Sequence, residues 1–139
     1  MTSAREGGCL CGAVRYQVQG SPSRTVVCHC KFCQRCTGSA FAVWPTYAQR
    51  DVQTKGALSA YEHRSDESGR WIRLNFCARC GTTVSSTFEK GADEVAILGG
   101  TFDDTGWLDV DRHVWTRSKQ HWVALPQDAR LFEKSSTGS

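Results

Sequence analysis

Cys9-Leu10-Cys11-Gly12 and Cys77-Ala78-Arg79-Cys80-Gly81 share one pattern, a close cysteine pair followed at once by glycine. Cysteines one or two positions apart rarely close an unstrained disulfide, whereas a single metal ion accepts both thiolates of such a pair. The glycine permits the positive φ of a tight turn whose backbone N–H groups point at the sulfurs. The pattern therefore predicts one closed, structural zinc site of four thiolates: Cys9, Cys11, Cys77 and Cys80.

A third cysteine group, Cys28-His29-Cys30-Lys31-Phe32-Cys33, has no glycine after its last cysteine. Cys28 and Cys30 are expected to share a face where a strand ends, with Cys33 on the following turn. Three protein ligands with a fourth position open to water or substrate are the usual arrangement of a catalytic zinc. Cys36 is a possible fourth ligand, a disulfide partner of Cys33 when metal is absent, or a packed thiol. We favour three ligands and a nearby free thiol.

The histidines are predicted not to bind metal. In an extended Cys28-His29-Cys30 segment the His29 side chain points away from both sulfurs, which favours a supporting or packing role. His113 and His121 lie among tryptophans and are predicted to be core or pocket residues. His63 lies in a polar stretch and is predicted to be solvated.

The composition favours a single domain in the cytoplasm. A net charge of +3, from 17 basic and 14 acidic residues, includes no dense basic block, so no nucleic-acid partner is expected. The polar N-terminus lacks the apolar region of a secretory signal. No apolar run approaches the roughly 18 residues of a membrane span. Thiols are kept reduced in the cytosol, where the chain is expected to lie. Its small positive net charge suits small anionic ligands.

Short apolar and alternating segments predict a mainly β fold. Extended segments are expected at 14–19, 25–28, 41–44, 71–76, 95–98, 113–115 and 122–125. Pro45 is expected to interrupt its strand, residues 62–70 to form an exposed loop, and residues 31–36 to make one helical turn. The predicted organisation is a flexible N-terminus over 1–7, one domain over 8–132 and a flexible tail over 133–139.

Further motifs follow in order along the chain: Thr37-Gly38-Ser39-Ala40-Phe41, Phe76-Cys77-Ala78-Arg79-Cys80-Gly81-Thr82, Gly100-Thr101-Phe102-Asp103-Asp104 and His113-Val114-Trp115-Thr116-Arg117. Together with the segments over 8–14 and 28–35, they resemble the glutathione-dependent formaldehyde-activating enzyme family, which shares its opening motifs with the centromere protein V domain. The resemblance runs from about Gly8 to Phe132.

This resemblance implies a β-tent of small antiparallel sheets, stapled by zinc, with two zinc ions per chain. It assigns Cys9, Cys11, Cys77 and Cys80 to a structural site, and Cys28, Cys30 and Cys33 to a catalytic or labile one. Cys36 departs from the family pattern. The implied activity is that of a carbon–sulfur lyase, which joins formaldehyde to glutathione as S-hydroxymethylglutathione.

For the activity that the resemblance implies, the second zinc is expected to hold the thiol substrate as a thiolate or, alternatively, to polarise the aldehyde oxygen. Lys31, Arg35 and Arg79 are candidate partners for the carboxylates of glutathione or a related thiol. Two other functions remain open: a non-catalytic zinc module that binds a thiol metabolite or a protein partner, and a thiol reductase that uses Cys33 and Cys36.

Overall fold

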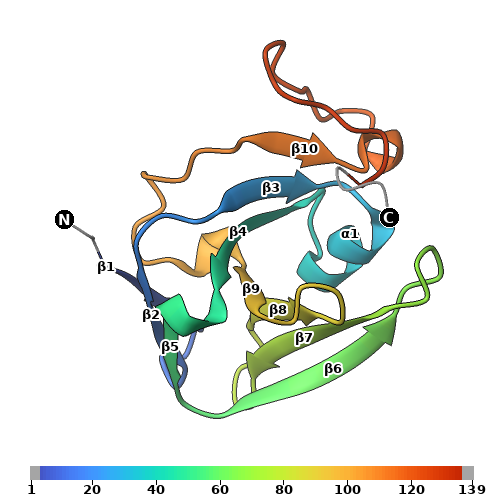
Figure 1. Cartoon of the computed structure of the whole chain (residues 1–139). Helices are drawn as coiled ribbons and strands as arrows, with labels where there is room; N and C mark the ends of the chain where they lie inside the picture. Colours follow the sequence, from blue (N-terminus) through green and yellow to red (C-terminus); the bar gives the residue numbers. More distant parts are fainter. Residues whose placement is uncertain (1–3, 136–139) are drawn as a thin grey trace.

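Ten strands and one α-helix make up the part of the chain that the computed structural model describes, residues 4–135 (Figure 1). The strands are β1 (Ala4–Gly8), β2 (Arg15–Gln19), β3 (Arg24–Cys28), β4 (Ala42–Ala48), β5 (Val52–Lys55), β6 (Leu58–Arg64), β7 (Trp71–Cys77), β8 (Thr83–Phe88), β9 (Glu94–Ile97) and β10 (Arg112–Val114). The α-helix is α1 (Lys31–Thr37), and short 3-10 turns are η1 (Gln49–Asp51), η2 (Gly99–Thr101) and η3 (Thr116–Ser118). The predicted mainly β class is confirmed.

The strands form two sheets. The smaller has the order β1-β2-β5 and is antiparallel throughout, while the larger has the order β10-β3-β4-β9-β8-β7-β6. One pairing in the larger sheet, between β3 and β10, is parallel, with Val27 opposite His113. This pairing places β10 beside β3, the strand that leads into α1 (Figure 1).

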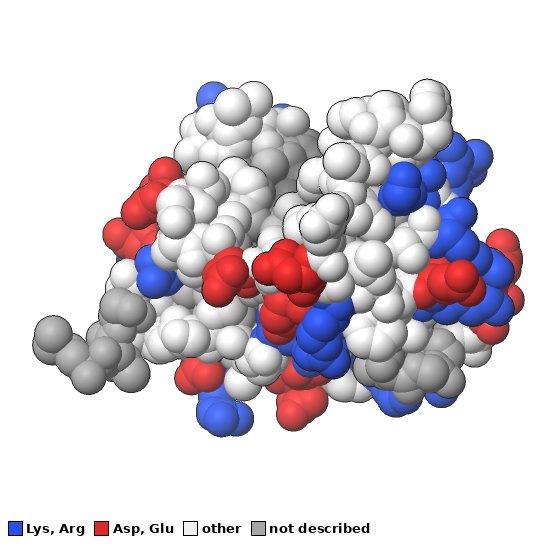
Figure 2. Space-filling model, turned by 90° about the horizontal axis from the view of Figure 1, so that it is seen from above, with Lys and Arg blue, Asp and Glu red and all other residues white. Residues whose placement is uncertain are grey.

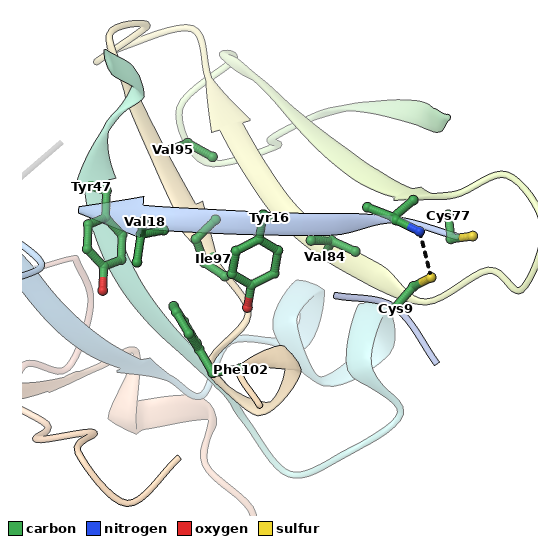
Figure 3. Packing of buried hydrophobic residues seen from close by; sticks show 10 residues of the cluster. Cys9, Tyr16, Val18, Tyr47, Cys77, Val84, Val95, Ile97 and Phe102 are labelled. Carbon is green, nitrogen blue, oxygen red and sulfur yellow. Dashed lines mark hydrogen bonds between the residues drawn. The ribbon is translucent and has the colours of Figure 1, made fainter. Parts of the chain in front are cut away.

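Alternating side chains divide the core between the two faces of the larger sheet. In β9, Val95 and Ile97 belong to one buried cluster and Ala96 to another, as the two-residue period of a strand requires. The first cluster packs the larger sheet against β2 of the smaller one (Figure 3) and includes Cys9 and Cys77. The second cluster packs the opposite face against α1 and includes Cys28 and Cys33. The two cysteine groups therefore belong to different faces of one sheet.

Two expectations about strands were wrong. Residues 62–64, expected in a loop, belong to β6, because β6 pairs residue by residue with the apolar strand β7. Glu62 of β6 and Arg73 of β7 also form an ion pair of 2.8 Å. Pro45 does not interrupt β4 but lies buried within it, one residue before the pairing with β9 begins at Thr46. A proline is tolerated where no ladder hydrogen bond requires its N–H.

The region after β10 is less regular than expected. Residues 122–125 form no strand; instead Val123 donates a backbone hydrogen bond of 3.1 Å to Gln120 and closes a turn. At the termini, residues 4–7 of the predicted flexible segment lie in β1, and the Lys134 carbonyl accepts a backbone bond of 3.1 Å from Trp115. The predicted flexible residues 1–3 and 136–139 lie outside the described residues.

The surface carries charges of both signs. Figure 2 shows Lys and Arg side chains beside Asp and Glu side chains on the face it presents, with broad uncharged areas between them. Between residues 4 and 135 the chain has no helix with the length and apolar character required to span a membrane.

Candidate metal centres

The four-cysteine group brings together the segment between β1 and β2, which carries Cys9 and Cys11, and the end of β7 with the turn after it, which carry Cys77 and Cys80. The sulfurs of Cys9, Cys11, Cys77 and Cys80 all lie within 4.8 Å of one another. Cys9 Sγ is 3.6 Å from Cys11 Sγ, which is 3.8 Å from Cys77 Sγ. Four sulfurs placed tetrahedrally at about 2.3 Å from a zinc ion are about 3.8 Å apart. The arrangement of the sulfurs therefore fits a zinc ion, as the paired motifs predict.

Backbone N–H groups surround these sulfurs. Val14 donates to Cys9 Sγ at 3.2 Å, a bond drawn in Figure 3, and Arg79 and Cys80 donate to Cys77 Sγ at 3.3 and 3.4 Å. Gly12 and Gly81 close the two turns with φ values of 82° and 80°. Such N–H bonds partly balance the negative charge of a tetrathiolate site, which is how second-sphere groups tune a metal centre.

The three-cysteine group is built where β3 meets α1. Cys28 ends β3, Cys30 is the N-cap residue of α1, and Cys33 lies in its first turn. Their three sulfurs also lie within 4.8 Å of one another. The Cys33 backbone N–H donates to Cys30 Sγ at 3.4 Å, and the Trp44 indole N–H donates to Cys33 Sγ at 3.4 Å. The sulfurs fit a metal ion here too, with three protein ligands.

Each group contains at least one thiol with a lowered pKa. Hydrogen bonds from Cys28 and Cys33 lower the pKa of Cys30 to about 3. A hydrogen bond from the Thr82 hydroxyl lowers the pKa of Cys80 to about 5. Because a metal binds thiolate and not thiol, both groups present a negative charge suited to a cation.

Cys36 stands apart from the three-cysteine group. Its sulfur is not among those that lie within 4.8 Å of one another, and its thiol points back at the Cys33 carbonyl, 3.5 Å away. Burial raises the pKa of the Cys36 thiol to about 11, so it stays protonated. The structure therefore groups three sulfurs that could hold a metal ion, and the Cys36 thiol lies outside this group.

The histidines support the fold around this centre. His29 is fully buried and lies 3.0 Å from His113, between Nε2 of the first and Nδ1 of the second. His63, predicted to be solvated, is instead half-buried against the Phe32 ring, with 4.8 Å between ring centroids. His121, predicted to lie in the core or a pocket, is exposed. The expectation for His63 failed because β6 lies against α1.

A cavity of about 450 Å³ lies beside α1. We call it the α1 pocket; it is lined by Lys31, Gln34, Arg35, Gly38, Ser39, Ala40, Gln120 and Trp122. Two of the three basic residues singled out in the sequence, Lys31 and Arg35, are thus brought together. Arg79 lies elsewhere, in the turn between Cys77 and Cys80 of the four-cysteine group.

The pattern of the cysteines and the fold that carries them agree with one known family. The family model for the glutathione-dependent formaldehyde-activating enzyme matches residues 4–118, which is most of the chain. The chain belongs to this family. Its match begins at Ala4, the first residue of β1, and ends at Ser118, the last residue of η3.

Two relatives of this chain have low sequence identity to it. An uncharacterized lyase of Schizosaccharomyces pombe is 22% identical over 127 residues, which cover 91% of this chain and 89% of the relative. A Rhodobacter sphaeroides protein of known crystal structure is 23% identical, with a TM-score of 0.56 over 70% of this chain and 87% of that one. The latter likeness supports the fold.

Three residues near the family's cysteine motifs had no predicted role. Trp44 reaches Cys33 only because β4 crosses beside α1, and nothing in the sequence signals that contact. Gln34 lies inside the motif over 28–35, so its position in the sequence could have indicated a role near the cysteines. Trp122 belongs to the turn that replaced an expected strand, and it is 66% exposed. An exposed tryptophan beside a cavity is a signal that only the structure makes visible.

Proposed function

We propose that this chain is a zinc-dependent carbon–sulfur lyase that forms or cleaves an S-hydroxymethyl adduct of glutathione or a related thiol. The observation that carries the proposal is the difference between the two cysteine groups. Four sulfurs complete a tetrahedral site, whereas Cys28, Cys30 and Cys33 leave one position for a substrate atom. Family membership and a relative named as a lyase support this choice.

The reaction is an addition to a carbonyl group. In the forming direction the sulfur of the thiol bonds to the carbonyl carbon of formaldehyde, the carbon–oxygen π bond and the S–H bond break, and the proton of the thiol ends on the oxygen, so no oxidant or reductant is required. A zinc ion on the three thiolates would hold the substrate sulfur in its deprotonated, nucleophilic form.

The residues around the three-cysteine centre have separate roles in this proposal. The Trp44 indole N–H and the Cys33 backbone N–H stabilise negative charge on the ligand sulfurs. Cys28 and Cys33 are both buried, which restricts access of water to the sulfurs. Lys31 and Arg35 remain the proposed contacts for the carboxylates of the thiol, through the α1 pocket, whereas the place of Arg79 in the turn of the four-cysteine group does not support that role.

Exchange NMR on formaldehyde and glutathione tests the activity. The zinc-loaded protein should raise the exchange rate above that of buffer, and Cys30→Ser should abolish the increase because it removes a central ligand. Cys36→Ser, next to the centre but outside the ligand set, is the matched control and should retain it. An exchange rate equal to buffer for the wild-type protein would contradict the lyase and favour a non-catalytic zinc module.

A further inference from the structure

The two faces of α1 carry different chemistry. Lys31, Gln34 and Arg35 have the i, i+3, i+4 spacing that places side chains on one helix face, and all three line the α1 pocket. Cys33 and Cys36 fall on the opposite face. The α1 pocket therefore begins one residue after the ligand Cys30 and lies across the helix from Cys33.

A chain of hydrogen bonds joins the wall of this pocket to the three-cysteine centre. The Trp122 Nε1–H donates to Gln120 Oε1 at 2.7 Å, and Gln120 Nε2 donates to Gln34 Oε1 at 3.1 Å. Gln34 Nε2 then donates to two backbone carbonyls, that of His29 at 2.9 Å and that of Ser118 at 3.0 Å. Gln34 is only 8% exposed. Its amide is thus fixed at both ends inside the protein.

The His29 carbonyl is the last link in this chain. It belongs to the residue between Cys28 and Cys30, so a shift of Gln34 displaces the backbone that positions both sulfurs. A buried, fully bonded amide holds its neighbours in one arrangement, because breaking any of its bonds leaves a polar group unsatisfied. Gln34 therefore fixes the position of the pocket wall relative to Cys28 and Cys30.

The lining of the pocket selects an anionic ligand. Within residues 4–135, neither Lys31 nor Arg35 takes part in an ion pair. Trp122 offers an exposed ring beside these two cations. A cavity with uncompensated positive charge and one aromatic wall suits a carboxylate attached to a flat or apolar body, such as a peptide unit.

We propose that the α1 pocket binds the distal carboxylate of a peptide thiol, with Trp122 against its backbone and Gln34 as the positioning residue that links pocket and centre. This inference rests on the proposed function. The pocket lining begins at Lys31, the residue after Cys30, so a ligand whose sulfur lies near Cys30 has to pass only the start of α1 to reach the pocket. An extended peptide spans about 3.3–3.6 Å per residue, and one turn of a helix rises about 5.4 Å, so a carboxylate one or two residues from the sulfur covers a comparable length. Small thiols without a distant carboxylate cannot engage both.

Calorimetric titration with S-methylglutathione tests the pocket without turnover, because a thioether keeps the carboxylates but has no thiol to react. The zinc-loaded full chain should bind it, and the dimethyl ester, which lacks both carboxylate charges, should bind at least about tenfold more weakly. Lys31→Ala and Arg35→Ala should each raise the Kd about tenfold. Equal Kd values for acid and ester, or no binding by the wild-type chain, would overturn the proposal.

Matched substitutions separate the pocket from general charge. Lys55→Ala and Arg50→Ala remove the same charges from exposed positions on β5 and η1, and should leave the Kd unchanged. A rise in Kd equal to that of Lys31→Ala and Arg35→Ala would overturn the proposal. If the ligand binds as proposed but the formaldehyde exchange rate equals that of buffer, the pocket proposal is supported and the lyase proposal is contradicted. If exchange is accelerated and Arg35→Ala has the same Kd as Arg50→Ala, the lyase proposal is supported and the pocket proposal is contradicted.

The link through Gln34 has its own readout. NMR signals of the Gln34 side-chain amide should shift when S-methylglutathione binds, and should also shift in Trp122→Phe, which keeps an aromatic ring but removes the N–H donor to Gln120. Trp122→Ala should weaken binding further because the ring is lost. Gln53→Ala, at an exposed position on β5, should change neither the signals nor the Kd. Gln34 amide signals that stay fixed on ligand binding would refute the positioning role.

Discussion

Trp44 and Cys33 are joined by an indole N–H···S hydrogen bond of 3.4 Å between β4 and α1. Both side chains are buried, so the bond forms away from competing water. A donor aimed at a sulfur stabilises the thiolate more than the thiol, because the negative charge strengthens the bond. Trp44 thus adds a hydrogen bond from β4 of the larger sheet to a sulfur of the three-cysteine centre.

Trp44→Phe should therefore weaken metal retention at the three-cysteine centre. Phenylalanine keeps most of the buried apolar surface but removes the donor, so the charged sulfur loses a bond that contributes about 1.5–3 kcal/mol. We expect zinc to transfer to a competing chelator about tenfold faster from this centre. Trp71→Phe, on β7 at a half-buried position, is the matched control. Equal transfer rates for Trp44→Phe and wild type would show that the indole N–H does not support the metal.

The cysteine arrangement was predictable because its signal is local. Spacings of one and two residues and the glycines after Cys11 and Cys80 indicate two turns that face one ion, and the structure brings all four sulfurs together. Cys28, Cys30 and Cys33 are likewise defined by a strand end and the first turn of a helix. In these segments the backbone conformation follows from the residues themselves.

Features that depend on distant pairing could not be predicted. The polar residues 62–64 become a strand only because β7 provides a partner over the full length of β6. His63 is half-buried for the same reason, since β6 carries it onto Phe32 of α1. Trp122 and Gln120 reach Gln34 only after the parallel pairing of β10 with β3 returns the chain to α1. Such contacts depend on topology, and no short pattern encodes them.

Removal of the Cys36 thiol should leave the metal content unchanged. Cys36 points at the Cys33 carbonyl and lies outside the group of three sulfurs that could hold a metal ion, so Cys36→Ala removes a packed thiol and leaves that group intact. We expect two zinc ions per chain by elemental analysis in Cys36→Ala and a reduced content in Cys33→Ala. A loss of one zinc in Cys36→Ala would mean that the second site is closed by a fourth thiolate. Unchanged catalysis in the same variant would dispose of a Cys33–Cys36 reductase.

The turn glycines should contribute to stability through backbone conformation alone. Gly12 has a φ of 82°, and a Cβ added there would meet no atom within 4 Å. Gly12→Ala should thus cost about 1–2 kcal/mol of unfolding free energy, the penalty of a left-handed backbone for a non-glycine residue. Urea unfolding of the zinc-loaded protein measures this cost. Gly100→Ala is the matched control, because Gly100 also faces open space but has no positive φ. An equal loss of unfolding free energy in both variants would show that the positive φ of Gly12 is not the cause.

Stability should fall with acidification partly through the His29–His113 pair. Burial lowers the pKa of His113, and burial together with the neighbouring His113 lowers the pKa of His29. The unfolded chain takes up protons at these imidazoles near pH 6.5, whereas the folded chain does so only at lower pH. Because the unfolded state then binds more protons, the free energy of unfolding decreases as the pH falls through about 6.5.

His113→Gln should make this decrease shallower, since it removes one buried imidazole while retaining a side chain that hydrogen-bonds. The free energy of unfolding, measured in urea with excess zinc at pH 7.5 and at about pH 5.5, should drop less in the variant than in the wild type. Proton competition for the thiolates affects both proteins alike, so the difference between them isolates the imidazole. His121→Gln, at an exposed position, should reproduce the wild-type decrease. Parallel curves for His113→Gln and wild type would mean that the buried pair contributes nothing to the acid sensitivity of the fold.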